Sequence, residues 1–228
     1  MLDTLSIIKT PAAARRLLPA ALWKVRTKDN ILYLTFDDGP IEDVTPQVLA
    51  ELKKYGAKAT FFCIGKNIMT NPALFHKILE EGHSIGNHTQ DHLNGWQTSN
   101  EEYFENIEKC AATIKSQITK VSRSRSEDME VGTEEVAFFR PPYGKLSPLQ
   151  YSHIKKSFKI VMWDVLTFDF DLKVTKELVL DNVLKNAGAG SIIVFHDSLK
   201  AKEKVLYALP KVLEHYSKMG YKFESLPE

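Results

Sequence analysis

From residue 31 onward, short apolar runs alternate with amphipathic stretches along the chain. Continuous apolar runs predict buried strands, whereas apolar residues spaced three and four apart predict helices with one buried face. The predicted strands cover residues 31–36, 59–63, 83–87, 137–140, 159–163, 191–195 and 221–224. The predicted helices cover residues 45–55, 72–81, a longer stretch around 103–114, and 203–218, and helical patterns also separate the strands at 137–140, 159–163 and 191–195. This alternation predicts an α/β fold of parallel strands covered by helices, either doubly wound or closed as a barrel.

The length of 228 residues suits one domain with a single large core. We assign residues 31–228 to this domain. Residues 1–30 show no strand–helix alternation and are interpreted as an N-terminal extension. Residues 119–135 are polar and charged without a clear period, so we expect a mobile insertion there.

The charges are nearly balanced, because 30 Lys and Arg face 29 Asp and Glu. A chain with this balance has no broad basic field, so we predict no nucleic-acid partner. No apolar run approaches the roughly 20 residues that a membrane span needs. Pro19 interrupts the short apolar stretch near the N-terminus, and we recognise no signal peptide. The cytoplasm is therefore the default location, with the cell envelope and the exterior as alternatives.

Polar clusters occur at the predicted carboxyl ends of four strands. In folds with parallel strands, these ends meet at one edge and carry the active site. The clusters are Asp37-Asp38-Gly39-Pro40, His88-Thr89-Gln90-Asp91-His92, Arg140-Pro141-Pro142-Tyr143-Gly144 and His196-Asp197. Each alone could be a turn, a surface pair or a helix cap. Their shared placement favours a single functional site.

Two of these clusters suggest a metal ion. The adjacent carboxylates of Asp37 and Asp38 at the end of an apolar strand are costly unless a cation compensates them. His88 and His92 are four residues apart, so both imidazoles can lie on one face and bind one metal ion if the segment is helical. A carboxylate with two histidines leaves coordination positions open for water or substrate, as catalytic sites do.

The segments TFDDGP (35–40), HTQDH (88–92), RPPYG (140–144) and VFHD (194–197) resemble motifs of the polysaccharide deacetylase family. This family is also called the NodB-homology domain, or carbohydrate esterase family 4. The resemblance covers roughly residues 30–225, with the motifs in the family's order. It implies a distorted (β/α) barrel and hydrolysis of N-acetyl, less often O-acetyl, groups on carbohydrates.

By matching position, the resemblance implies that Asp38, His88 and His92 bind a divalent metal. Zinc fits such ligands, and cobalt, nickel or manganese could take the same place. The metal would acidify the attacking water.

The resemblance also implies roles for residues around the metal. Asp37 would be the general base, and Arg140 would pair with it and set its basicity. His196 would be the general acid, oriented by Asp169. The backbone N–H of Tyr143 would help to bind the oxyanion.

The fourth family motif, usually Asp-x-x-Asp-Trp, departs here. Leu166 replaces the first acidic residue and Phe170 the tryptophan, although Asp169 keeps its carboxylate. This departure affects the expected acetyl pocket and substrate range. The candidate substrate-binding residues are Pro141, Tyr143, Trp96, Phe170 and Val194.

The predicted function is metal-dependent removal of N-acetyl groups from amino-sugar oligomers or polysaccharides, chitin-like or peptidoglycan-like. The alternative is an amidohydrolase or deformylase that acts on a small, non-polymeric amide, since no signal peptide is recognised. A non-catalytic carbohydrate-binding relic is disfavoured, because the candidate ligands, base and acid are all present.

Overall fold

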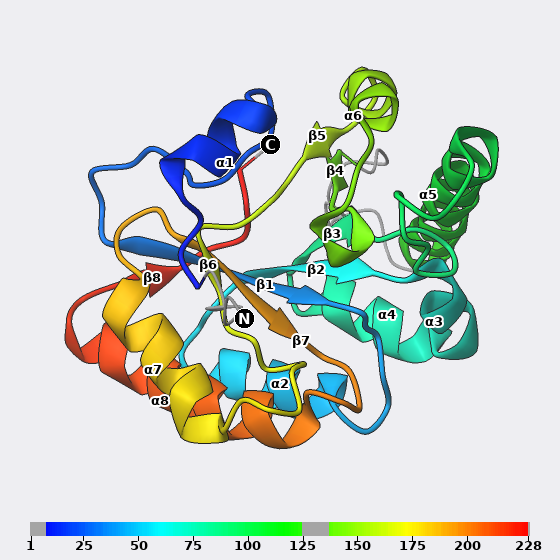
Figure 1. The fold of residues 1–228 in the computed structure, drawn as a ribbon. Helices are drawn as coiled ribbons and strands as arrows, with labels where there is room; N and C mark the ends of the chain where they lie inside the picture. Colours follow the sequence, from blue (N-terminus) through cyan, green and yellow to red (C-terminus); the bar gives the residue numbers. More distant parts are fainter. Residues whose placement is uncertain (1–7, 125–136, 228) are drawn as a thin grey trace.

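The computed structural model describes residues 8–124 and 137–227 (Figure 1). Its strands form one curled sheet in which every pair is parallel. The spatial order is β5-β4-β3-β2-β1-β7-β6, and β8 pairs with β1. The strands are β1 (Ile31–Asp37), β2 (Ala59–Cys63), β3 (Ser84–Asn87), β4 (Phe138–Phe139), β5 (Lys159–Ile160), β6 (Val165–Leu166), β7 (Ile192–His196) and β8 (Lys222–Phe223).

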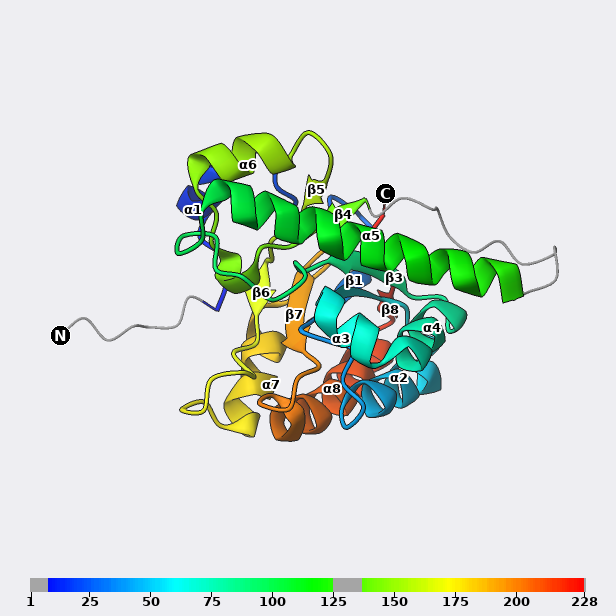
Figure 2. The same ribbon diagram turned by 90° about the vertical axis from the view of Figure 1, so that its right-hand side faces the viewer.

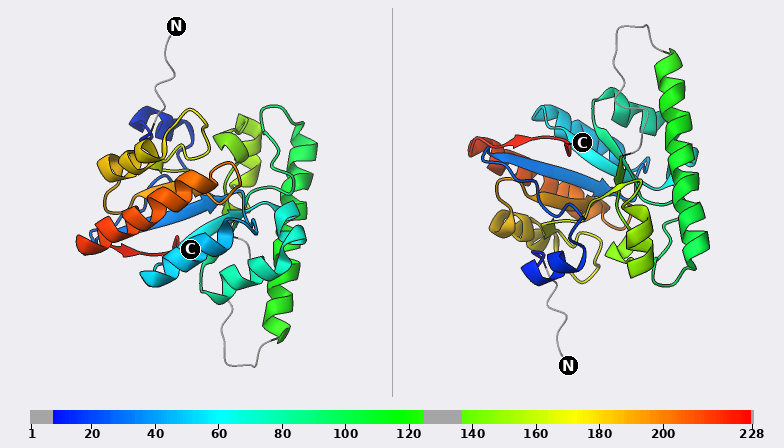
Figure 3. Two further views of the ribbon diagram at one scale, coloured as in Figure 1. Left: turned by 90° about the horizontal axis from the view of Figure 1, so that it is seen from below. Right: turned by 90° about the horizontal axis from the view of Figure 1, so that it is seen from above.

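Helices cover the outer surface of this curled sheet. They are α1 (Ala12–Leu17), α2 (Thr45–Lys54), α3 (Gly65–Thr70), α4 (Pro72–Glu80), α5 (Asn100–Ser124), α6 (Pro148–Ile154), α7 (Lys176–Asn186) and α8 (Lys202–Lys218). A short 3-10 helix, η1, covers Pro142–Gly144. The view from below in Figure 3 shows α2, α7 and α8 in front of the strands, and Figure 2 shows α5 along the side that carries β3 and β4. The fold is therefore a single-domain half-barrel, as the sequence predicts.

Strand β1 separates the core from the interior of the half-barrel, because successive side chains point to opposite faces. Leu34 and Phe36 pack into the large core beneath α2 and α8. Tyr33 belongs to a separate apolar cluster inside the curl. Thr35 and Asp37 share the face of Tyr33, which places the Asp37 carboxylate inside the barrel.

Some elements differ from the sequence prediction. Strand β6 and helices α1 and α3 were not predicted, and all three are short. The strand predicted over 159–163 ends at Ile160, since the carbonyls of Val161 and Met162 turn to accept hydrogen bonds from Arg140. Helix α5 continues through Ser124, so residues 119–124 are helical. Residues 125–135 of the expected insertion lie outside the described residues.

The described part of the N-terminal extension packs against the barrel between β5 and β6. Leu22 forms a parallel bridge with Val161, and Lys9 forms an antiparallel bridge with Val165. The Arg15 guanidinium lies 2.5 Å from the fully buried carboxylate of Asp164. Residues 8–30 thus bridge the two ends of the open sheet. Among the described residues, no helix combines the length and apolarity of a membrane span.

Candidate active site

The four polar clusters meet at one edge of the sheet, as predicted. They follow the carboxyl ends of β1, β3, β4 and β7, and residues from each cluster line a cavity of about 510 Å³. This arrangement follows from parallel pairing, because Asp37 on β1 lies in register with His196 on β7. Strand register therefore brings Asp37 and His196 together, although they are far apart in the sequence.

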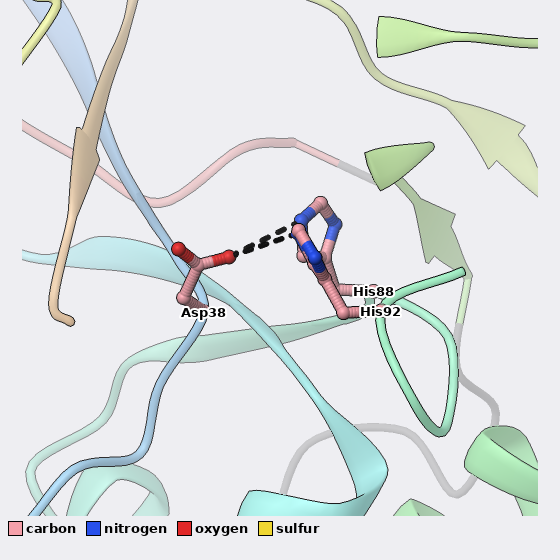
Figure 4. Close-up of side chains that lie close together, drawn as sticks. All are labelled: Asp38, His88 and His92. Atoms are coloured by element: carbon pink, nitrogen blue, oxygen red, sulfur yellow. Dashed lines mark ion pairs between the residues drawn. The ribbon is translucent and has the colours of Figure 1, made fainter. Parts of the chain in front are cut away.

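Asp38, His88 and His92 point toward one another (Figure 4). Asp38 Oδ1 lies 3.2 Å from Nε2 of His92 and 3.7 Å from Nε2 of His88. Asp38 and His92 both adopt left-handed backbone conformations, with φ of 80° and 59°. Such conformations are costly for non-glycine residues and concentrate at functional sites. Here they turn both side chains toward a common point.

This trio has the features of a metal-binding site. Asp38 Oδ1 is buried and accepts no hydrogen bond from any described residue. Nδ1 of His88 lies 2.8 Å from the carbonyl oxygen of Arg140, which fixes the tautomer with a free Nε2 lone pair. Burial lowers the pKa of His88 to about 4, so this imidazole is neutral at neutral pH. A cation fits the donor set, because it would satisfy the orphaned oxygen and both lone pairs.

Beside the trio, Arg140 holds Asp37 in a fully buried ion pair. One guanidinium nitrogen, Nη1, donates to Asp37 Oδ1 and to Thr35 Oγ1, each at 2.7 Å. The other nitrogens donate to the carbonyls of Val161 and Met162 at 3.2 and 2.9 Å. The guanidinium is therefore fixed on several sides, and it fixes the orientation of the carboxylate.

On the neighbouring strand β7, His196 is bound by Asp169. Nδ1 of His196 lies 2.7 Å from Oδ1 of Asp169, and the His196 backbone N–H donates to Oδ2 at 2.8 Å. Burial alone would lower the pKa of His196. The charge and hydrogen bond of Asp169, helped by Asp38 and Asp37, outweigh burial and raise this pKa to about 9. The imidazole is thus a protonated donor at neutral pH.

Known proteins resemble this chain over most of its length. The sequence profile of the polysaccharide deacetylase family matches residues 24–157. A peptidoglycan-N-acetylglucosamine deacetylase of Bacillus cereus is 33% identical over 208 residues, which cover 90% of this chain and 91% of that protein. The chain belongs to the polysaccharide deacetylase family. It is accordingly a carbohydrate deacetylase, a hydrolase of carbon–nitrogen bonds other than peptide bonds.

Further relatives of this deacetylase agree with that assignment. A chitooligosaccharide deacetylase of Azorhizobium caulinodans is 31% identical over 188 residues, which cover 81% of each chain. A crystal structure of a peptidoglycan N-acetylglucosamine deacetylase, bound to a naphthyl-substituted N-hydroxybenzamide, superposes with a TM-score of 0.81. The two sequences are 31% identical, and the superposition covers 96% of this chain and 95% of the chain in that structure.

In this deacetylase, the cavity has one polar and one apolar side. The apolar side is formed by Trp163, Leu166, Phe170, Val194 and Leu199. Of the predicted substrate-binding residues, Pro141, Tyr143, Phe170 and Val194 line the cavity. Trp96 is not part of its wall. The indole of Trp96 is 66% exposed, and its N–H donates to the carbonyl of Leu146.

Sequence reasoning missed a buried polar group beneath the metal-binding loop. Asp197 is fully buried, and its Oδ2 accepts a hydrogen bond of 2.5 Å from Thr45 Oγ1. The same hydroxyl accepts a hydrogen bond from the backbone N–H of Ile41. A Cβ atom on Gly39 would lie 2.0 Å from Asp197 Oδ2, so this position requires glycine. These contacts hold residues 38–41 in place. In the sequence, the only sign of them was that Asp197 follows His196.

The pKa of Asp197 is also displaced. Burial raises it, the Thr45 hydrogen bond opposes the change, and the Asp38 charge adds to it, with a result of about 7. The cavity wall includes Trp163 and Lys200 as well, neither of which was predicted as a site residue. No motif marks either position in the sequence.

Proposed function

We propose that this protein is a divalent-metal-dependent N-deacetylase of amino-sugar oligomers or polysaccharides, peptidoglycan-like or chitin-like. One observation carries the proposal. A trio of candidate metal ligands, a buried carboxylate–guanidinium pair and a protonated histidine–carboxylate pair surround the same cavity. The names of the relatives support the substrate class.

In this proposal Asp38, His88 and His92 hold the metal, which we take to be zinc, with cobalt, nickel or manganese as alternatives. The donors suit it, since each offers a free oxygen or nitrogen and the three atoms lie within 4.8 Å of one another. When bound, the cation supplies positive charge that acidifies a water molecule and polarises the acyl carbonyl.

The protein's own residues then perform the proton transfers. Asp37 takes a proton from the water as its oxygen attacks the acyl carbon. Arg140 keeps the carboxylate oriented throughout, through the hydrogen bond of 2.7 Å. The backbone N–H of Tyr143 stabilises the negative charge on the carbonyl oxygen. A positive φ of 59° at Tyr143 supports this role, because it sets the direction of that peptide group, and the Tyr143 ring lies 4.7 Å from the His92 ring between centres.

His196 supplies the proton that the leaving amine requires. The carbon–nitrogen bond breaks as its electron pair takes this proton, and acetate and a free amino sugar are the products. Asp169 holds His196 protonated and presents its other ring nitrogen to the cavity. The base and the acid come from register partners on neighbouring strands, Asp37 on β1 and His196 on β7, so both can reach the same acyl group.

The decisive experiment measures acetate release from N-acetylglucosamine oligomers. Wild type and Asp37→Asn protein are stripped of metal and assayed before and after reloading with zinc. We expect metal-dependent release by wild type and a loss of at least about 100-fold in the variant. Asp43→Asn is the matched control, because Asp43 is an exposed carboxylate near the start of α2. If zinc binds but wild type releases no acetate, the sugar substrate is wrong, and small amides become the next candidates.

A further inference from the structure

Lys200 is a cation in the wall of the active-site cavity, in the turn between β7 and α8. The turn is fixed at both ends, because Asp197 and Ala201 are fully buried. The backbone N–H of Ala201 also donates to the carbonyl of Ser198 at 3.0 Å. The backbone of Lys200 is thus anchored, while its side chain is exposed at the rim.

Lys200 is unusual in this cavity because it has no partner of opposite charge. Its ammonium lies within 4.0 Å of no carboxylate among the described residues, whereas Asp37 is paired with Arg140 and His196 with Asp169. Asp38 faces His88 and His92, the other two candidate metal ligands. The rim therefore carries one uncompensated positive charge.

The Lys200 ammonium lies over an aromatic ring. The Lys200 ammonium lies 5.9 Å from the centre of the Phe170 ring. That ring lies edge-on to His196, with 4.9 Å between the ring centres. The two distances place the ammonium within about 11 Å of the imidazole. A sugar whose amide lies at the His196 imidazole can therefore carry a second group that reaches the Lys200 ammonium.

A contact with an aromatic face orients a cation but does not neutralise it. The ammonium keeps its hydrogen-bond donors for an anion. Ser198 lines the same rim and offers a hydroxyl. One ammonium with one hydroxyl matches a singly charged carboxylate.

We propose that Lys200 binds a carboxylate on the substrate, so that carboxylate-bearing amino-sugar chains are preferred over neutral ones. The inference rests on the proposed deacetylase function and narrows its substrate class. It follows from the juxtaposition of an unpaired lysine with Phe170 and His196, and from the pairing of Asp37 with Arg140 and of His196 with Asp169.

The test compares two oligomers that differ in a single charge. Both are N-acetylglucosamine oligomers with an O-linked lactyl group, which ends in a carboxylate in one and in a carboxamide in the other. The readout is the ratio of kcat/KM for the acid to that for the amide. We expect a ratio of about five in wild type, because a partly exposed ion pair contributes about 1 kcal/mol. The ratio should decrease as salt is added.

Three variants locate the charge that is responsible. Lys200→Gln should bring the ratio close to one, and Lys200→Arg should restore most of it. Lys53→Gln is the matched control, because Lys53 is exposed on α2. A wild-type ratio near one would overturn the inference, as would an unchanged ratio in Lys200→Gln.

A binding measurement separates this inference from the deacetylase proposal. Isothermal titration of both oligomers into zinc-loaded Asp37→Asn protein, with and without Lys200→Gln, reports affinity without turnover. Preferential binding of the acid that depends on Lys200 supports the inference even if wild type releases no acetate, in which case only the deacetylase proposal fails. If the protein releases acetate but has equal kcat/KM and equal affinity for both oligomers, the inference is overturned and the deacetylase proposal stands.

Discussion

Asp169 should control the protonation of His196, and Asp169→Asn tests this directly. Burial favours the neutral imidazole, so without the Asp169 charge the pKa of His196 should fall from about 9 to its ordinary value of about 6.5 or below. This fall corresponds to about 3 kcal/mol of proton affinity. The side chain of His196 is only 13% exposed, so solvent screens little of the interaction.

NMR titration of the His196 ring in metal-free protein measures this pKa. The zinc-loaded enzymes should differ too, because at about pH 8 the variant's imidazole is mostly neutral and kcat should fall by at least about tenfold. Asp171→Asn is the control, since it removes a carboxylate two residues away that caps the N–H of Lys173. A His196 pKa that stays near 9 in metal-free Asp169→Asn protein would refute the reasoning.

The same change should alter the pH dependence of stability. The pKa of His196 is higher in the folded protein than in the unfolded chain, so folded protein binds more protons between about pH 6.5 and 9. The stabilisation from this pair is therefore complete below about pH 6.5 and is lost as the pH rises through about 9. Urea unfolding of wild type should show this loss, and Asp169→Asn should not.

Two further substitutions test residues that hold the active-site side chains in position. Arg140→Met should lower the free energy of unfolding by about 3–5 kcal/mol, because it leaves the buried Asp37 carboxylate without its cation, and the shift in urea midpoint measures this. A midpoint equal to that of wild type would contradict it. Thr45→Val should weaken zinc binding by about tenfold, since it removes both hydrogen bonds that tie Asp197 to the loop before α2. Thr45→Ser keeps the hydroxyl and should bind zinc like wild type. A zinc affinity of Thr45→Val equal to that of wild type would show that these hydrogen bonds do not support the metal-binding residues.

The polar clusters could be placed from sequence because parallel strands impose their own geometry. Once Asp37, His88 and His196 were predicted to follow directly after parallel strands, these strand ends had to share one edge of the sheet. The structure confirms that these residues surround one cavity. Strand periodicity was thus sufficient to predict that distant residues meet.

Other features could not be predicted, because they depend on packing rather than on a local pattern. Lys200 lies in a turn, where neither helical nor strand periodicity applies. The hydrogen bond from Thr45 to Asp197 joins residues 152 positions apart. Arg15 meets Asp164 across 149 positions, and the described part of the extension that carries it, from residue 8 onward, has no strand of its own. Strand β6 is only two residues long, too short to show a period.

The two faces of β1 explain how the site can hold so many buried polar groups. On the outer face, Phe36 stacks between Phe61 and Phe195, with ring centres 5.0 and 6.0 Å away. These apolar contacts fix the register of β1 with β2 and β7, because a slip by one residue would turn Phe36 toward the charged interior. The same register points Asp37 into the cavity. The aromatic core therefore holds the carboxylate in place, and its packing offsets the cost of burying charge on the other face of the strand.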